Sequence, residues 1–130
     1  MRVALPYWHG RVSPVFDVAQ DLLVVDIEKS VESQRESRAL IYADPWRRAG
    51  ELAGLGTDVL ICGAISRVLE AALTRSGVKV IGFVCGNIEE VVSAFMDGDI
   101  MSPRFWMPGR CSRKRRVGIR RAAVKTENND

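Results

Sequence analysis

A strand-like run that ends in Cys-Gly and leads into a helical pattern occurs twice in this chain, and it limits the fold more than any other feature. The first copy spans residues 57–66 and the second spans residues 80–88. Each combines a short apolar, β-branched run with an amphipathic segment after the glycine. Strands joined by helices run parallel to one another. We therefore expect Cys62 and Cys85 to share the carboxyl edge of one sheet, where ligands of α/β proteins bind.

The rest of the chain predicts an α/β fold with the order β-β-β-α-β-α-β-α. The first expected strand spans residues 2–6, where Pro6 ends the ladder. A partly buried edge strand is expected within residues 32–42, which turn apolar at 39–42. The other expected strands span residues 22–27, 57–62 and 78–84. Expected helices begin after Asp44, Ser66 and Asn87 and end near Gly54, Gly77 and Gly98. Residues 7–17 read as a loop that leaves the carboxyl end of the first strand. In the first helix, Trp46, Ala49, Leu52 and Ala53 fall at helical spacing.

Charge divides the chain into two parts. Residues 1–103 hold 10 basic and 14 acidic side chains, whereas residues 104–130 hold 9 basic and 2 acidic ones. We predict one domain over residues 1–111 and a basic, disordered tail over residues 112–130. No apolar run approaches the ~20 residues of a membrane span, and the N-terminus lacks the pattern of a signal peptide. A cytoplasmic protein without membrane contact is the resulting expectation.

Three cysteines are an odd number, which speaks against a disulfide framework and for reduced thiols. Cys62 and Cys85 each precede a predicted helix N-terminus, where the dipole favours a thiolate and free N–H groups, such as those of Gly63 and Gly86, attract an anion. The alternative is that both thiols are buried and purely structural, since free cysteine packs as a small hydrophobe.

His9 and Arg11 fall on the same predicted edge as the two thiols, and Cys111 could reach it from the tail. A soft site of sulfur and imidazole ligands is one interpretation. Catalysis is not expected, because the single histidine has no carboxylate near it in sequence except Asp17, and no phosphate-binding glycine motif is present. A second interpretation is an interaction module whose basic run at 110–121 docks on an acidic protein or a nucleic acid.

With these motifs in view, the chain resembles the dinitrogenase iron-molybdenum cofactor biosynthesis family, which includes NifX-like and NifB C-terminal-like domains. The resemblance covers residues 1–111 and is carried by the segments 10–17, 58–66 and 85–87. It implies a ribonuclease H-like fold with a mixed sheet. It also implies non-enzymatic binding, carriage or assembly of an iron-sulfur or molybdenum-containing cluster, exchanged with donor or acceptor proteins.

The resulting hypothesis is a carrier whose metal ligands are thiolates. The expected ligands are Cys62, Cys85 and Cys111, and the pocket is completed by His9, Arg11, Ser13, Gly63 and Gly86.

Overall fold

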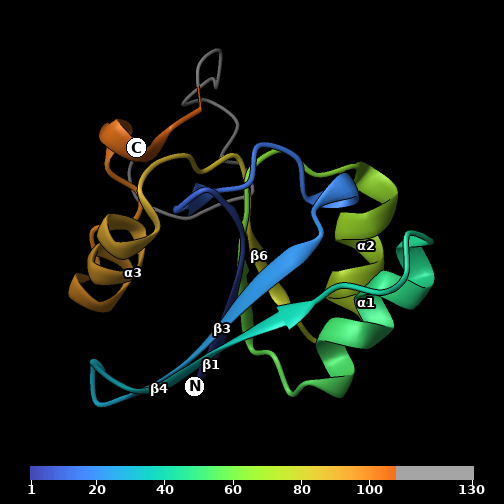
Figure 1. Cartoon of the computed structure of the whole chain (residues 1–130), viewed down its shortest axis with the longest axis horizontal. Helices are drawn as coiled ribbons and strands as arrows, with labels where there is room; N and C mark the ends of the chain where they lie inside the picture. Colours follow the sequence, from blue (N-terminus) through green and yellow to red (C-terminus); the bar gives the residue numbers. More distant parts are fainter. Residues whose placement is uncertain (108–130) are drawn as a thin grey trace.

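One mixed sheet runs through the middle of the molecule, with helix α3 on one face and helices α1 and α2 on the other (Figure 1). The computed structural model describes residues 1–107. The strands are β1 (Arg2–Trp8), β2 (Arg11–Val12), β3 (Asp21–Glu28), β4 (Val31–Ala39), β5 (Val59–Ile61) and β6 (Lys79–Ile81). The α-helices are α1 (Pro45–Gly54), α2 (Arg67–Arg75) and α3 (Ile88–Asp97), and single 3₁₀ turns occur at Phe16–Val18 and Pro103–Phe105.

The order of the strands across the sheet is β4-β3-β1-β5-β6. Strand β3 is antiparallel to both β1 and β4, whereas β5 and β6 run parallel to β1. This confirms the α/β class, and the expected element order holds apart from the two-residue strand β2, which pairs with the end of β1. None of the helices in residues 1–107 is long and apolar enough to span a membrane.

The prediction that Pro6 ends the first strand is wrong, because β1 continues to Trp8. Pro6 stays in register with Leu22 of β3, and its carbonyl accepts the N–H of Ser13 at 2.9 Å on the other side. The N–H and C=O of one strand residue point to the same side. The missing N–H of Pro6 therefore lies away from β3, and the β1–β3 ladder is not interrupted.

Three further expectations need correction, two about strand boundaries and one about which side chains of α1 are buried. The edge strand is Val31–Ala39, and residues 40–43 belong to no strand. The last strand is only Lys79–Ile81. In α1, Ala49 and Leu52 are buried as expected, but Trp46 is 53% exposed and Ala53 is exposed as well. The buried stripe of this short helix is therefore narrower than its apolar pattern suggests.

The predicted helix starts are confirmed by their caps. Side-chain oxygens of Asp44, Ser66 and Asn87 accept backbone N–H groups at the first turns of α1, α2 and α3. Each cap satisfies a donor that has no partner within its helix. At the end of α3, Gly98 adopts the left-handed conformation with φ of 78°, which ends the helix.

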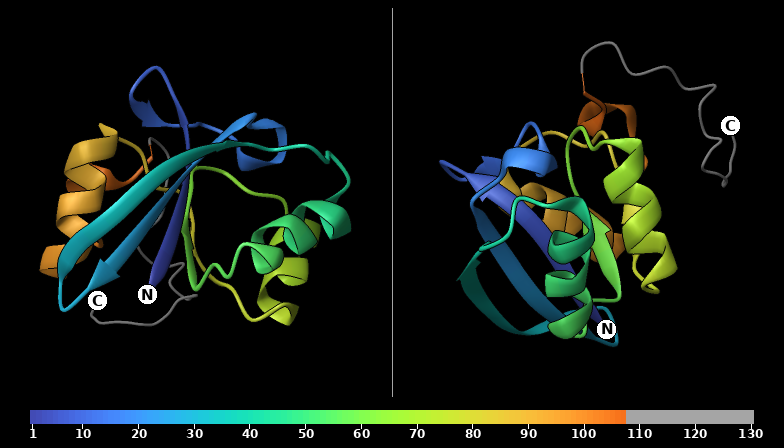
Figure 2. Two further views of the ribbon diagram at one scale, coloured as in Figure 1. Left: turned by 60° about the horizontal axis from the view of Figure 1, so that its bottom comes forward. Right: turned by 90° about the vertical axis from the view of Figure 1, so that its right-hand side faces the viewer.

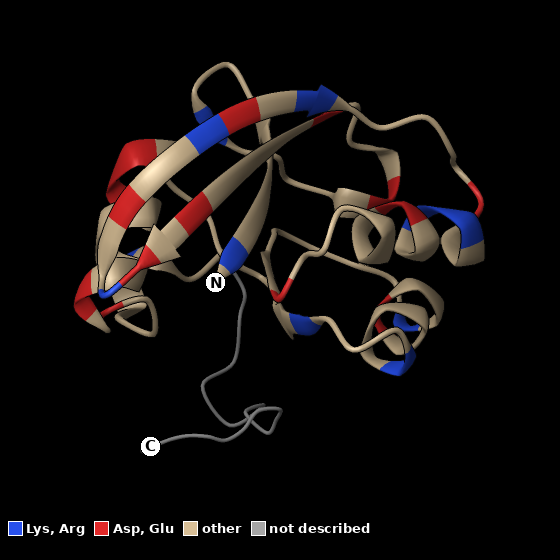
Figure 3. Ribbon diagram, turned by 90° about the horizontal axis from the view of Figure 1, so that it is seen from below, with Lys and Arg blue, Asp and Glu red and all other residues tan. Residues whose placement is uncertain are grey.

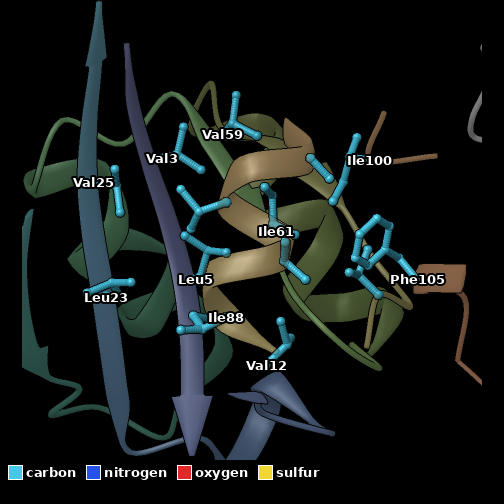
Figure 4. Packing of buried hydrophobic residues seen from close by; sticks show 14 of the residues in the cluster. Val3, Leu5, Val12, Leu23, Val25, Val59, Ile61, Ile88, Ile100 and Phe105 are labelled. Carbon is cyan, nitrogen blue, oxygen red and sulfur yellow. The ribbon is translucent and has the colours of Figure 1, made fainter. Parts of the chain in front are cut away.

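Alternation along the strands divides the core into two clusters. Val3, Leu5, Val59 and Ile61 face α3 together with Phe105 (Figure 4). The intervening residues of the same strands face α1 and α2: Ala4, Leu60 and, one residue beyond β5, Cys62. The period of two therefore directs the Cys62 side chain beneath the helices rather than out over the edge of the sheet.

Candidate functional site

Three loops meet at the carboxyl edge of β1, β5 and β6. The first is the β1–β2 hairpin, which projects from the sheet on the side opposite the N-terminus (Figure 2, left). Its two turn residues, His9 and Gly10, have φ of 53° and 77°, as a two-residue turn between twisted strands requires. The other two loops are 62–66, between β5 and α2, and 82–87, between β6 and α3.

The hairpin is bonded to the loop that carries Cys85. The N–H of Val12 donates to the carbonyl of Gly86 at 3.0 Å, and the N–H of Ile88 donates to the carbonyl of Gly10 at 2.9 Å. Arg11 consequently pairs with Asn87 in an antiparallel bridge. The exposed tip of the hairpin, where the Trp8 and His9 rings lie 4.0 Å apart, is thus held at the N-terminus of α3.

Segment 13–16 approaches the 62–66 loop so closely that only glycine fits at position 63. A Cβ atom there would lie 2.5 Å from the carbonyl oxygens of Ser13 and Pro14. The N–H of Ala64 donates to Pro14 and the N–H of Phe16 donates to Ala64, both at 2.8 Å. Gly63 and Ser13 are both buried, so their clearest role is to let the two loops pack together.

Cys62 and Cys85, the two cysteines within residues 1–107, differ sharply in environment. Cys62 is fully buried in the cluster beneath α1 and α2, and this burial raises the pKa of its thiol far above the ordinary value. Cys85 is only half-buried, and its Sγ lies 3.2 Å from the carbonyl oxygen of Trp106. At Cys62, desolvation therefore outweighs the stabilisation of a thiolate by the helix dipole. Of these two cysteines, Cys85 is the one whose thiol is partly accessible at the edge of the sheet.

Residues 105–107 lie across the Cys85 loop like a short extra strand. The N–H of Cys85 donates to Phe105 at 2.8 Å, and the N–H of Met107 donates to Phe83 at 3.1 Å. Val84 and Trp106 pair as an antiparallel bridge. Phe83 itself has φ of 61°, a conformation that bulky residues rarely adopt. The Cys85 loop is thus bonded to the β1–β2 hairpin on one side and to residues 105–107 on the other.

Charges around the edge leave the two helix starts unequal. The Asp17 carboxylate accepts the N–H of Ser66 at 2.8 Å, so a carboxylate already sits at the N-terminus of α2. The α3 start is capped by the neutral Asn87, and Glu89 in its first turn is paired with Arg35 at 2.6 Å. A carboxylate therefore occupies the start of α2, whereas a neutral amide caps α3; both first turns also carry acidic residues, Glu70 in α2 and Glu89 and Glu90 in α3.

The structure brings together only part of the expected site. Arg11 pairs with Asn87, and Gly86, the residue after Cys85, accepts a backbone hydrogen bond from Val12, with His9 at the adjoining hairpin tip. Cys62 lies in the core, and Cys111 is outside the described residues, as is the predicted tail. Within residues 1–107, no three His, Cys, Asp or Glu side chains are grouped so that they could hold a metal ion.

Two residues that sequence reasoning did not assign help to shape this edge. Asp17, which the sequence singled out only as the carboxylate nearest to His9 and as the end of segment 10–17, joins the first loop to α2. Arg48 is buried and donates to the carbonyls of Tyr42, Phe16 and Ala19 at 2.7, 2.7 and 2.9 Å. A charged residue in an amphipathic helix is normally expected to face solvent, so no signal indicated Arg48.

Comparison with known proteins places these features in a family. Residues 1–98 match the family described as dinitrogenase iron-molybdenum cofactor. No curated protein sequence matches the chain significantly.

Several solved structures are similar to this one. PH0822 shares 26% identity and a TM-score of 0.71, over 75% of this chain and 92% of its own. A Thermotoga protein assigned to NifB shares 25% identity and a TM-score of 0.61, over 75% and 89%. A Methanocaldococcus jannaschii protein assigned as a dinitrogenase shares 16% identity and a TM-score of 0.61, over 76% and 90%, which shows likeness of fold alone.

Proposed function

Since the chain belongs to the dinitrogenase iron-molybdenum cofactor family, we propose that it carries an anionic metal-sulfur cluster without catalysing a reaction. The cluster is bound at the carboxyl edge of the sheet, with the Cys85 thiolate as a ligand. One observation carries this proposal: the half-buried Cys85 stands two residues before Asn87, the N-cap of α3, and the carbonyl of the next residue, Gly86, accepts the N–H of Val12 in the β1–β2 hairpin.

The chemistry of this edge suits a cargo that brings its own sulfide. Such a cluster carries bridging sulfide and takes thiolates at its irons, and its negative charge favours a positive environment. Arg11 and the α3 dipole supply that environment, and His9 adds an imidazole at the hairpin tip.

Two of the expected thiols have different places in this proposal. Cys111 is four residues beyond Met107, which is bonded to Phe83, and four residues of extended chain span at most ~14 Å. Because this distance allows Cys111 to come near Cys85, we propose Cys111 as the second thiolate ligand. Cys62 is not needed as a ligand, because its side chain packs in the core.

The fold is proposed to be of the ribonuclease H-like class. The antiparallel β4-β3-β1 segment followed by parallel β5 and β6 supports this assignment. Docking of the basic run at 110–121 on an acidic protein or nucleic acid concerns residues outside the described part of the chain, so it stays a prediction.

Anaerobic reconstitution tests the carrier proposal. The reduced full-length chain is incubated with ferrous iron and sulfide and desalted, and then its visible absorption, bound iron and bound sulfide are measured. We expect a cluster chromophore that is lost in Cys85→Ser and weakened in Cys111→Ser. Arg11→Ala should bind the cluster more weakly than the wild type at low salt and should depend less on salt, because salt screens exposed charges and the variant has lost one of them.

Cys62→Ala is the matched control, because this residue occupies the same strand, Cys-Gly, helix context but is buried. We expect it to keep the chromophore once its fold is verified by circular dichroism. Equal reconstitution of the wild-type chain and Cys85→Ser would refute ligation by Cys85. Loss of the chromophore in a folded Cys62→Ala variant would return Cys62 to the site.

A further inference from the structure

Strand β4 forms one edge of the sheet, and β6 forms the other. It is nine residues long and pairs with β3 on its inner side. In residues 1–107 no second strand pairs with its outer side. Figure 3 shows acidic and basic residues alternating along this strand. A long unpaired edge is a template for another strand, so its side chains decide which partner it accepts.

The two faces of β4 differ in how their charges are used. On the face toward α3, Arg35 is bonded to Glu32 and Glu89, and Ser37 to Tyr7. On the opposite face, Glu36 and Arg38 lie opposite Val24 and Leu22 of β3. These two side chains pair with each other at 3.1 Å and are 44% and 49% exposed, and the pKa of Arg2 on β1 is raised by Asp26 and, to a lesser extent, by the Glu36 carboxylate. A surface pair of this kind contributes little by itself and is available for exchange.

We propose that β4 pairs with β4 of a second copy of this chain, antiparallel and about a two-fold axis at Ser37. Residues directly opposite each other in such a ladder share a face and interact. Glu36 then lies opposite Arg38 of the second copy, and Arg38 lies opposite its Glu36. The pairing extends the sheet through both copies and exchanges two internal ion pairs for two between chains.

Charge selects this register over its neighbours. An axis at Glu36 would place two glutamates opposite each other, and an axis at Arg38 would place two arginines there. An axis between two residues would bring opposite faces of the strands together, which the period of two forbids. Of these axes, the one at Ser37 gives opposite charges on the exposed face.

The features that usually protect an edge do not block this segment. Charges of a single sign repel a second copy, but here the sign alternates between Glu36 and Arg38. No proline occurs in β4. The irregularity of the β3–β4 ladder lies between Asp26 and Ile27, opposite residues 32–34 and at the end of the pairing segment.

Sedimentation equilibrium of the reduced full-length chain over a range of concentrations tests the proposal. We expect a reversible dimer for the wild-type chain, weakened by salt. Glu36→Arg and Arg38→Glu each place like charges opposite one another twice, so each should raise the dimer dissociation constant roughly tenfold or more. Glu70→Arg makes the same charge change on α2, away from the edge, and should leave the constant unchanged.

Mixing the two variants gives the decisive measurement. The Glu36→Arg chain carries arginine at both positions and the Arg38→Glu chain carries glutamate at both, so a heterodimer has opposite charges facing each other throughout. The mixture should therefore form heterodimers of near wild-type affinity, and a misfolded variant could not be rescued in this way. A monomeric wild-type chain at every concentration, or single variants that dimerise like the wild type, would overturn the proposal, and so would a mixture that shows no rescue.

Discussion

Replacing Gly63 by alanine should destabilise the protein strongly, although it adds one methyl group. The new Cβ would lie 2.5 Å from the carbonyl oxygens of Ser13 and Pro14, and carbon–oxygen contacts are normally about 3.3 Å or longer. Both obstacles are backbone atoms, so no side chain can rotate away. The two loops must therefore separate by roughly 0.8 Å.

That movement acts on the two bonds that join the loops, from Ala64 to Pro14 and from Phe16 to Ala64, each now 2.8 Å long. Overpacking costs about 1–3 kcal/mol, and each weakened buried hydrogen bond about 1 kcal/mol or more. We expect Gly63→Ala to lower the free energy of unfolding by about 3 kcal/mol, which corresponds to a fall in Tm of roughly 10–20 °C.

Urea denaturation followed by circular dichroism measures this change, and Gly82→Ala is the matched control. A Cβ at position 82 would meet its nearest atoms at 3.5 Å and 3.7 Å, which are ordinary contacts. We expect that control to change stability by less than about 1 kcal/mol. If Gly63→Ala is as stable as Gly82→Ala, then the close approach of the loops is not a constraint and this reasoning is refuted.

Four other outcomes are expected. A chromogenic disulfide reagent should modify Cys85 in the native chain and reach Cys62 only on unfolding, as peptide mapping would show. Burial raises the pKa of the Cys62 thiol, so the stability that the buried neutral thiol contributes is complete below the pKa of the unfolded chain, about 8.5, and is lost as pH rises above that value. Urea denaturation at pH 10 should therefore show a free energy of unfolding lower by ~2 kcal/mol, a loss that Cys62→Ala lacks. Arg48→Met should cost roughly 2–4 kcal/mol in urea denaturation, because two buried carbonyls and one partly buried carbonyl lose their donor. Gly50→Ala should raise stability by ~0.5–1 kcal/mol in the same assay, because a Cβ in this helix meets nothing within 4 Å.

Sequence reasoning succeeded where a single local signal decides the structure. The caps Asp44, Ser66 and Asn87 were identifiable because each places a short polar side chain before a helical pattern. The carboxyl edge followed from the repeated strand, Cys-Gly, helix pattern. Local rules failed at Pro6, where the outcome depends on which side of the strand the missing N–H faces, a property of the whole sheet.

Cys62 and Cys85 show the same difference between what a local pattern predicts and what depends on contacts distant in sequence. Alternation along β5 already places Cys62 on the face of Leu60, so its burial could have been derived from the sequence. Nothing in the sequence indicated that the Trp106 carbonyl would lie over Cys85, because that contact joins residues 21 positions apart. Buried Arg48 was equally hidden, since its partners are carbonyls on two separate segments.

The strand-like path of residues 105–107 has a practical consequence for handling the protein. The chain passes Met107 next to Phe83, two residues from Cys85, whereas Met1 is bonded to Ile27 at the far end of β1. Cutting the chain after Met107 and joining a polyhistidine tag there would remove Cys111 and start a run of imidazoles next to Phe83, two residues from the proposed cargo thiol. One attached before Met1 would begin at the opposite end of the sheet, so iron-binding measurements are best made with tags placed there and then removed.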